Sequence, residues 1–162
     1  RRLASEVKAD AVTAYKKIVQ VLSPLAQAKN IDLTVDIPSG LPKVAMGNEL
    51  LGQLFLNLLE NGIKYTPAGG KVWLQVGEDQ GYVAIEVGDT GPGIPNESLS
   101  RIFERFYRVD RARSREMGGT GLGLSIVKHI VEQAGGKMQV ESELGQGTLF
   151  KIWIPEFSEM QE

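Results

Sequence analysis

Glycines cluster in two stretches that suit contact with a phosphorylated ligand. The chain has 19 glycines, and seven lie between positions 88 and 123, in residues 87–95 (VGDTGPGIP) and 118–125 (GGTGLGLS). Glycine lets a backbone approach a ligand closely and adopt positive φ. The second stretch leads into a predicted helix, whose free N–H groups and dipole would attract phosphate. Ordinary turns are the alternative, but four glycines in six residues at a helix start would serve a simple turn poorly.

The spacing of these glycines excludes two common phosphate-binding motifs. A dinucleotide fingerprint needs G-x-G-x-x-G within a βαβ unit, whereas the spacing from Gly119 onward is G-x-G-x-G. A P-loop needs Gly-Lys followed by Ser or Thr. Lys71 and Lys137 both follow glycine but precede Val72 and Met138. Another kind of phosphate site is therefore indicated.

A leucine-rich helix predicted over residues 49–65 carries polar groups suited to Mg²⁺ and phosphate. Asn57, Asn61 and Lys64 fall within roughly 60° of arc at the edge of its apolar stripe. Mg²⁺ prefers oxygen ligands and often combines a few protein groups with phosphates. An asparagine carbonyl suits that role, and a lysine one turn later could meet a phosphate oxygen. The alternative is an ordinary polar helix edge.

Arginines concentrate in one segment. Six of the eight lie between residues 101 and 115, in a stretch with little periodicity that also contains aromatic side chains. A basic, aromatic-containing loop just before a glycine-rich helix start suggests a lid over a polyphosphate. The alternative is a solvated surface loop.

The elements that must position these groups follow from hydrophobic periodicity. Helices are predicted over residues 10–29, 49–65 and 120–134, with a short one near 96–104; strands are predicted over 31–37, 71–78, 82–87, 137–143 and 148–154. Pro24 should kink or break the first helix, and Asn48 should cap the second. Helices followed by hairpin-connected strands indicate a two-layer α/β sandwich with a mostly antiparallel sheet.

Composition limits the alternatives. The 162 residues suit one domain, with 42% hydrophobic residues and a net charge of −2. This balance does not favour a nucleic-acid or membrane-surface binder. The absence of cysteine excludes a disulfide scaffold, a thiolate metal site and a cysteine nucleophile. The sequence also has no apolar run near the ~20 residues of a membrane-spanning helix.

Five segments in this order resemble the catalytic ATP-binding domain of sensor histidine kinases, within the GHKL superfamily. They are an N box at 57–67 (NLLENGIKYTP), a G1 box at 89–94 (DTGPGI), an F box at 102–108 (IFERFYR), a G2 box at 119–124 (GTGLGL) and a last glycine motif at 145–148 (GQGT). The resemblance covers roughly residues 10–155. It implies the Bergerat fold, a two-layer α/β sandwich whose mostly antiparallel mixed sheet has helices on one face.

The resemblance implies a site for the adenine base. Asp89 would accept a hydrogen bond from the adenine amino group, where guanine would present an oxygen instead. Gly91 and Gly93 would let the chain pass close to the base. Ile94 and Thr148 also belong to the implied cofactor-binding set.

The resemblance also implies a site for Mg²⁺ and the phosphates. Asn61 would bind Mg²⁺, Asn57 would sit beside the phosphates and their water, Lys64 would contact phosphate, and Tyr65 would lie near the nucleotide. The G2 box would contact the phosphates through backbone N–H groups or by a close approach of the chain, at Gly119, Gly121, Leu122 and Gly123.

Two arginines would assist the chemistry. Arg108 and Arg105 would stabilise charge on the transferred γ-phosphoryl group, with Phe103 and Phe106 anchoring the lid. ATPase relatives have a glutamate base at the position of Asn57. An asparagine cannot act as that base, which favours transfer over rapid hydrolysis.

The implied function is transfer of the γ-phosphoryl group of Mg²⁺-ATP to a histidine on a dimerisation domain outside this chain. Residues 1–9 would connect to that domain and 10–162 would form the catalytic domain. His129, the only histidine, lies within a predicted helix without the acidic neighbour of a phosphoacceptor box. The isolated chain is therefore expected to bind ATP without phosphorylating itself.

The expected partners are the dimerisation domain of the same kinase and a downstream response regulator. Neither nucleic acid nor direct membrane contact is expected, and the expected location is the cytoplasm, whether or not the parent protein is membrane-anchored. The alternatives are a GHKL-type ATPase or serine kinase, and a degenerate nucleotide-binding module with a regulatory role.

Overall fold

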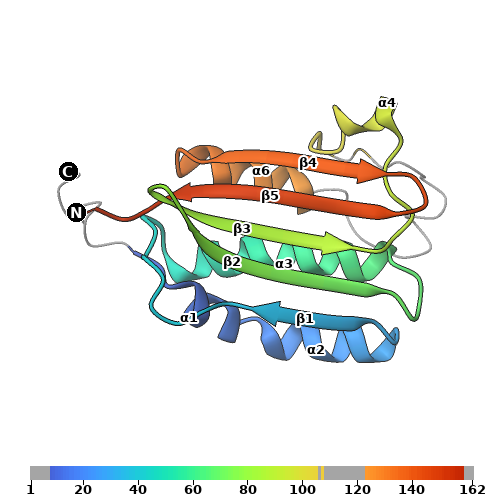
Figure 1. The fold of residues 1–162 in the computed structure, drawn as a ribbon, viewed down its shortest axis with the longest axis horizontal. Coiled ribbons are helices and arrows are strands. Elements are labelled where there is room, and N and C mark those ends of the chain that lie inside the picture. Colours follow the sequence, from blue (N-terminus) through green and yellow to red (C-terminus); the bar gives the residue numbers. More distant parts are fainter. Residues whose placement is uncertain (1–7, 106, 108–122, 159–162) are drawn as a thin grey trace.

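The computed structural model describes residues 8–105, 107 and 123–158, and these ranges contain one five-stranded sheet in the order β1-β2-β3-β5-β4 (Figure 1). The strands are β1 Asp32–Asp36, β2 Lys71–Asp79, β3 Tyr82–Asp89, β4 Lys137–Glu143 and β5 Gly147–Pro155. Strand β1 pairs with β2 in parallel, and the other three pairings are antiparallel. The expected mixed, mostly antiparallel sheet is confirmed.

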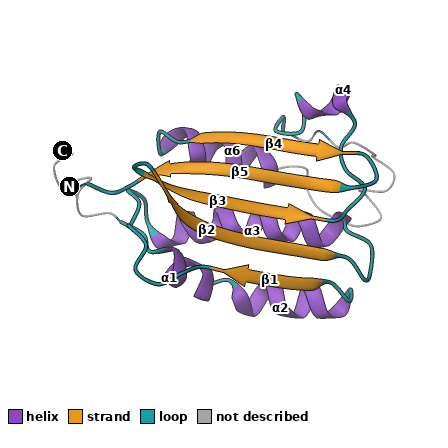
Figure 2. Ribbon diagram, viewed as in Figure 1, coloured by secondary structure: helices purple, strands orange, loops and turns teal. Residues whose placement is uncertain are grey.

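The main helices cover one face of this sheet (Figure 2). They are α1 Ala11–Lys16, α2 Val19–Ala28, α3 Asn48–Tyr65 and α6 Gly123–Gln133. The short helix α4, Asn96–Leu99, lies outside that layer, beyond the β4 edge of the sheet (Figure 1). This arrangement confirms the predicted two-layer α/β sandwich.

Alternation of side chains along the strands produces the core. In β2, Val72, Leu74 and Val76 are buried, while the residues between them are not. The same alternation runs through β3 and β5, and α3 packs a row of buried leucines against this face. Because the side chains of a strand alternate between faces, one face forms the core and the other stays open.

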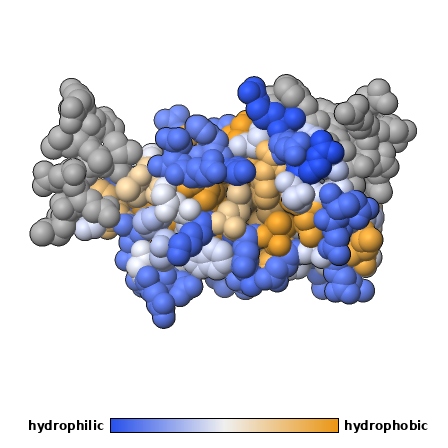
Figure 3. All heavy atoms as spheres, turned by 90° about the horizontal axis from the view of Figure 1, so that it is seen from above, coloured by the Kyte–Doolittle hydropathy of each residue, from blue (hydrophilic) through white to orange (hydrophobic). Residues whose placement is uncertain are grey.

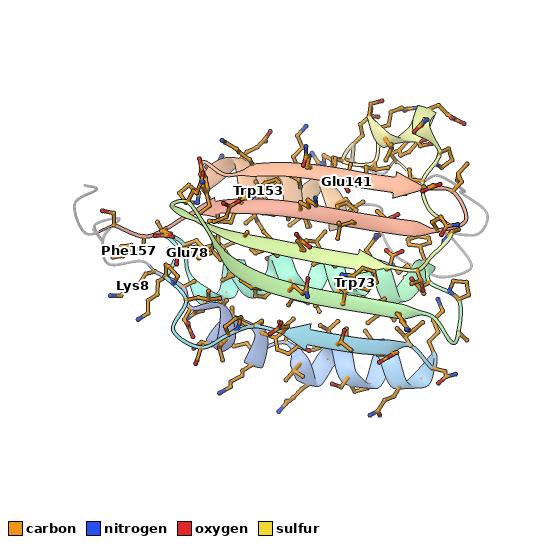
Figure 4. The ribbon with its side chains drawn as sticks, in the orientation of Figure 1. Lys8, Trp73, Glu78, Glu141, Trp153 and Phe157 are labelled. Atoms are coloured by element: carbon orange, nitrogen blue, oxygen red, sulfur yellow. The ribbon has the colours of Figure 1, made fainter. Side chains whose placement is uncertain are left out.

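The open face carries both tryptophans of the chain (Figure 4). Trp73 pairs with Gly88 on the next strand, and a Cβ at position 88 would overlap the indole ring, so only glycine leaves room for it. Trp153 donates from Nε1 to Asp79 Oδ2 at 3.2 Å. These contacts fix aromatic side chains across a face that no helix covers among the described residues.

The first helix breaks earlier than predicted. The chain forms two helices, and the break lies at Lys17 and Ile18 rather than at Pro24, which sits inside α2. At this break the buried Ile18 side chain lies 3.6 Å from where a Cβ of Gly52 in α3 would be. Packing of the junction against α3 therefore decides the position of the break, a tertiary effect that helical periodicity does not reveal.

The predicted cap of α3 is also wrong. Helix α3 begins at Asn48 itself, and Gly47 is its N-cap residue. The side chain of Asn48 instead accepts a hydrogen bond from the backbone N–H of Asp10 at 2.9 Å. Asp10 is the N-cap of α1, where its carboxylate accepts from the N–H of Thr13. Asn48 thus ties together the starts of two helices.

The segment after α4 is mostly turns, so only four residues of the predicted 96–104 helix are helical. Phe103 packs edge-on against Phe150 of β5, with ring centroids 6.2 Å apart.

From the side of α4 and β4, hydrophobic atoms reach the surface between groups of hydrophilic residues (Figure 3). Within the described residues, no helix is long and apolar enough to cross a membrane.

Candidate functional site

Most of the described site residues expected from sequence lie at one end of the sheet. The end of α3, the end of β3, the start of α6 and the β4–β5 hairpin come together there, at the opposite end from both termini (Figure 1). Pairing within the sheet places Asp89, the last residue of β3, opposite Thr148 of β5. The topology thus assembles segments that lie far apart in the sequence.

Asp89 is a partly buried carboxyl group at the centre of this region. Its Oδ1 accepts a hydrogen bond from the N–H of Gly91 at 2.8 Å. Burial raises the pKa of Asp89 above its ordinary value of 3.8, and the N–H groups of Gly91 and Thr148 lower it by a smaller amount. The fold therefore holds a desolvated hydrogen-bond acceptor in a fixed orientation.

The loop after β3 is fastened to the β4–β5 hairpin. Gly93 has φ of +79°, and a Cβ there would overlap the carbonyl of Glu143, so this close approach requires glycine. The N–H of Gly145 donates to the carbonyl oxygen of Pro92 at 2.9 Å. The close approach at Gly93 is to the hairpin, and its expected approach to the base stays a prediction.

Ser142 joins this loop to Thr148, although it belongs to none of the motifs recognised in the sequence. Its Oγ accepts from the N–H of Ile94 at 2.8 Å, donates to the carbonyl oxygen of Gly147 at 3.1 Å, and lies 2.8 Å from Thr148 Oγ1. Two expected site residues, Ile94 and Thr148, are thereby held by one hydroxyl group. Nothing in the alternating pattern of β4 marks this serine.

We expect Ser142→Ala to lower the free energy of unfolding by about 2 kcal/mol, because it leaves the Ile94 N–H and the Gly147 carbonyl without this partner. Nucleotide affinity should also fall severalfold, since the Thr148 hydroxyl loses its support. Urea unfolding and calorimetric titration with ADP measure the two effects. Ser39→Ala, at an exposed turn, is the matched control. Equal stability of the two variants would contradict the role of Ser142.

The asparagine-bearing edge of α3 lies beside the start of α6. Asn57 Nδ2 donates to the carbonyl oxygen of Gly123, the first residue of α6, at 3.5 Å. Asn61 lies one turn further along α3, and Lys64 and Tyr65 form its last turn. The described residues contain no cluster of three or more His, Asp or Glu side chains that could hold a metal. The side-chain oxygen of an asparagine on α3 would suit a Mg²⁺ ion whose other ligands are chiefly phosphate oxygens.

Gly62 and Thr66 bring the end of α3 close to Asp89. A Cβ at Gly62 would lie 3.2 Å from Val72 Cγ1 and 3.8 Å from Asp89 Cβ, so glycine keeps this gap narrow. Thr66, the C-cap residue of α3, is fully buried, and its hydroxyl has no hydrogen-bond partner among the described residues. Thr66 belongs to the N box of the sequence, but no role was expected for its side chain.

The remaining expected residues are either outside the described part of the chain or exposed at its surface. Arg108, Gly119, Gly121 and Leu122, together with Phe106, lie outside the described residues. Arg105 is described and exposed, in the turns that follow α4. His129 is exposed on α6, as expected for an ordinary helix residue.

Comparisons with known proteins agree with this geometry. Residues 47–158 match the family described as histidine kinase-, DNA gyrase B- and HSP90-like ATPases. Sensor histidine kinase RppB of Synechocystis sp. is 49% identical over 135 residues, which cover 83% of this chain and 30% of that protein. Sensor histidine kinase WalK of Bacillus subtilis is 36% identical over 140 residues, covering 85% of this chain and 23% of that protein.

Solved structures show the same fold. The nucleotide-free catalytic domain of histidine kinase ThkA superposes with a TM-score of 0.78 at 26% identity, covering 93% of this chain and 95% of that one. Full-length ShkA in complex with AMPPNP gives a TM-score of 0.76 at 31% identity, covering 96% of this chain and 32% of that one.

The fold and the site define a GHKL-type ATP-binding domain. The chain belongs to the family of histidine kinase-, DNA gyrase B- and HSP90-like ATPases. Its relatives named above are sensor histidine kinases, and the matched region is the ATP-binding catalytic domain of such kinases. The chain spans less than a third of the length of these two curated relatives.

Proposed function

We propose that this chain binds Mg²⁺-ATP at the site end of the sheet and donates the γ-phosphoryl group to a histidine on a dimerisation domain of the same kinase. The observation that carries the proposal is the bond from Asn57 to Gly123. It places the polar edge of α3 beside the N-terminus of an 11-residue helix, where N–H groups favour an anion. This contact supports the proposal that the polar edge of α3 and the start of α6 serve the same phosphates.

Each part of the nucleotide has residues of suitable chemistry. Asp89, supported by Gly91 and Thr148, accepts from the adenine amino group, and Gly93 and Ile94 hold the loop beside it. Asn61 supplies the protein oxygen for Mg²⁺, while Asn57, Lys64 and Tyr65 serve the phosphates and sugar. Gly123, with Gly119, Gly121 and Leu122 before it, supplies backbone N–H groups. Bound Mg²⁺ would neutralise phosphate charge during transfer.

Transfer to a protein acceptor is favoured over hydrolysis. The amide of Asn57 has no basic group that could activate water. Arg108 and Arg105 would stabilise the charge of the transferred phosphoryl group. A response regulator would then receive the phosphoryl group from the histidine, outside this chain and at the cytoplasmic side of any membrane.

Residues 1–9 would connect the catalytic domain to the dimerisation domain. Where this segment meets the described residues, Ala9 pairs with Val44, and Val44 pairs in turn with Glu156. Lys8 lies over the ring of Phe157 with its Nζ 5.3 Å from the centroid (Figure 4). The domain would therefore be joined to its acceptor at the end opposite the nucleotide.

Radioactive transfer tests this function. The purified chain is incubated with Mg²⁺ and γ-labelled ATP, alone and with the dimerisation domain of its own kinase. We expect no label on this chain and acid-labile label on the added domain. Label on this chain, label on serine, or repeated phosphate release without an acceptor would contradict the proposal. The last two outcomes would support the serine kinase and ATPase alternatives, and absence of nucleotide binding would support a regulatory module.

Asn61→Ala should remove the contribution of Mg²⁺ to nucleotide binding. We expect about tenfold weaker ATP binding in Mg²⁺, because one oxygen ligand is lost, and unchanged affinity in EDTA. Calorimetric titrations with and without Mg²⁺ separate these effects. Gln53→Ala, at an exposed position of the same helix, is the control. An equal loss in EDTA would show that Asn61 does not act through the metal.

A further inference from the structure

A lysine at the end of α2 caps the end of α3. Lys29 is the C-cap residue of α2, and both helices finish at the end of the sheet that carries the candidate site (Figure 1). Lys29 Nζ donates to the carbonyl oxygen of Ile63 at 2.9 Å and also to that of Lys64. The last carbonyl groups of a helix have no partner within the helix, and the helix dipole makes this end negative. The ammonium group of Lys29 therefore satisfies two carbonyl groups at the negative end of α3.

The backbone around Lys29 holds this residue in a defined place. The N–H of Ile31 donates to the carbonyl oxygen of Ala26 at 2.9 Å, and Asn30 between them has φ of +57°. Many helices end in this way, with a left-handed residue directly after the cap. The carbonyl oxygen of Asn30 accepts from the N–H of Gly69 at 2.8 Å, in the turn that follows α3. The ends of α2 and α3 are thus joined by the backbone as well as by the Lys29 side chain.

The capped turn of α3 carries the lysine expected to contact phosphate. Lys64 lies in the last turn of α3, three residues after Asn61, and is partly buried. A lysine in a last helical turn can bond to the final carbonyl groups of its own helix. Because Lys29 already bonds to two of these groups, the ammonium group of Lys64 is not required there. Holding the carbonyl groups also fixes the backbone from which the Lys64 side chain extends.

We propose that Lys29 is a positioning residue of the phosphate site. It holds the last turn of α3 so that Lys64 presents its ammonium group to the phosphates of Mg²⁺-ATP, and Lys29 itself touches no phosphate. This inference rests on the proposed function, since it assigns the phosphates to the polar edge of α3.

Lys29→Met tests this role because methionine keeps an unbranched side chain and removes the ammonium group. We expect about fivefold weaker binding of Mg²⁺-ATP, because the last turn of α3 loses a charged hydrogen-bond donor. The melting temperature should fall by only about 5 °C, so that binding is measured on folded protein. Lys29→Arg, whose guanidinium group can also donate to two carbonyl groups, should bind Mg²⁺-ATP within about twofold of the wild type. Lys16→Met, at an exposed position in the last turn of α1, is the matched control and should change neither quantity appreciably.

Calorimetric titration of the double variant, Lys29→Met with Lys64→Met, shows whether the effect passes through Lys64. Lys64→Met alone should weaken Mg²⁺-ATP binding about tenfold, because a charged phosphate contact is lost. Adding Lys29→Met should then weaken binding by less than about twofold. A further loss of about fivefold in that background would overturn the inference, because Lys29 would then act independently of Lys64.

Salt separates positioning from simple attraction of ATP by one more positive charge. The effect of Lys29→Met on affinity should persist at high salt, whereas long-range attraction would be screened. Its disappearance at high salt would overturn the inference. A wild type that does not bind Mg²⁺-ATP would refute the proposed function itself. If the wild type binds, Lys64→Met binds more weakly and Lys29→Met matches the wild type, only this inference fails.

Discussion

Asp89→Asn is expected to weaken binding of ATP about 100-fold while leaving the unbound domain at least as stable as the wild type at neutral pH. The amide oxygen can still accept from the N–H of Gly91, which turns the NH₂ group toward the base. The NH₂ group of the variant would then face the adenine amino group, and both of these groups are hydrogen-bond donors. The loss of ATP affinity has two causes: a charge-assisted hydrogen bond is missing, and a buried donor is left without a partner.

The stability effect of Asp89→Asn follows from the direction of its pKa shift. Burial raises the pKa of Asp89, so the folded state binds the proton more tightly than the unfolded state does. The corresponding stability is present below the ordinary pKa of 3.8 and is lost as the pH rises through the raised value. Wild type and variant should therefore be similarly stable in acid, and the variant should gain relative stability toward neutral pH.

Calorimetric titration with ATP and thermal melts across the acid range measure both effects. Asp36→Asn, at an exposed position of β1, removes the same charge and should change neither result appreciably. ATP affinity of the wild type should also decrease as acid protonates Asp89. Undiminished ATP binding by Asp89→Asn would remove this residue from the base site.

Gly147→Ala is expected to lower the free energy of unfolding by about 3 kcal/mol, which for a domain of this size lowers the melting temperature by about 6–12 °C. Gly147 has φ of +138°, a conformation that L side chains rarely adopt. A Cβ there would also overlap the carbonyl oxygen of Asp89 and lie 3.1 Å from its carbonyl carbon. The backbone that carries Asp89, the carboxylate proposed to recognise the base, would have to move, so ATP affinity should fall as well.

Variants at two other glycines separate the effect of a positive φ from the effect of the overlap with the Asp89 carbonyl group. Gly145→Ala keeps the unfavourable φ of +80° but meets no atom within 4 Å, so we expect a loss of about 1–2 kcal/mol. Gly77→Ala has neither problem and should be within about 0.5 kcal/mol of wild type. Chemical denaturation of the three variants should give this order. Equal stability of the Gly145 and Gly147 variants would show that the overlap with Asp89 is relieved at little cost.

Local patterns predicted most of the fold because burial follows them closely here. Helix α3 and strands β2 and β3 were predicted to within two residues, since their apolar residues recur at the spacing of one covered face. The break at Ile18 and the contact from Asn48 to Asp10 could not be predicted in this way. Both depend on how α1 packs against α3, a contact between segments more than 30 residues apart.

In the candidate site too, some residues could be predicted from local sequence patterns and others depend on tertiary contacts. Motif residues such as Asp89 and Gly93 could be named from sequence because their order along the chain is characteristic. Ser142 was missed as a contributor because its role is created by pairing in three dimensions. Its hydroxyl group joins β4 to the loop after β3, and no local sequence pattern reveals that contact.

The contact between Trp73 and Gly88 gives this domain an intrinsic optical probe. The indole lies against the residue that precedes Asp89 along β3, whereas the second tryptophan, Trp153, is bonded to Asp79 at the other end of that face (Figure 4). Replacing Trp153 by phenylalanine would leave Trp73 as the single tryptophan, next to the proposed base site. Its emission wavelength and quenching would then follow nucleotide occupancy without any attached dye.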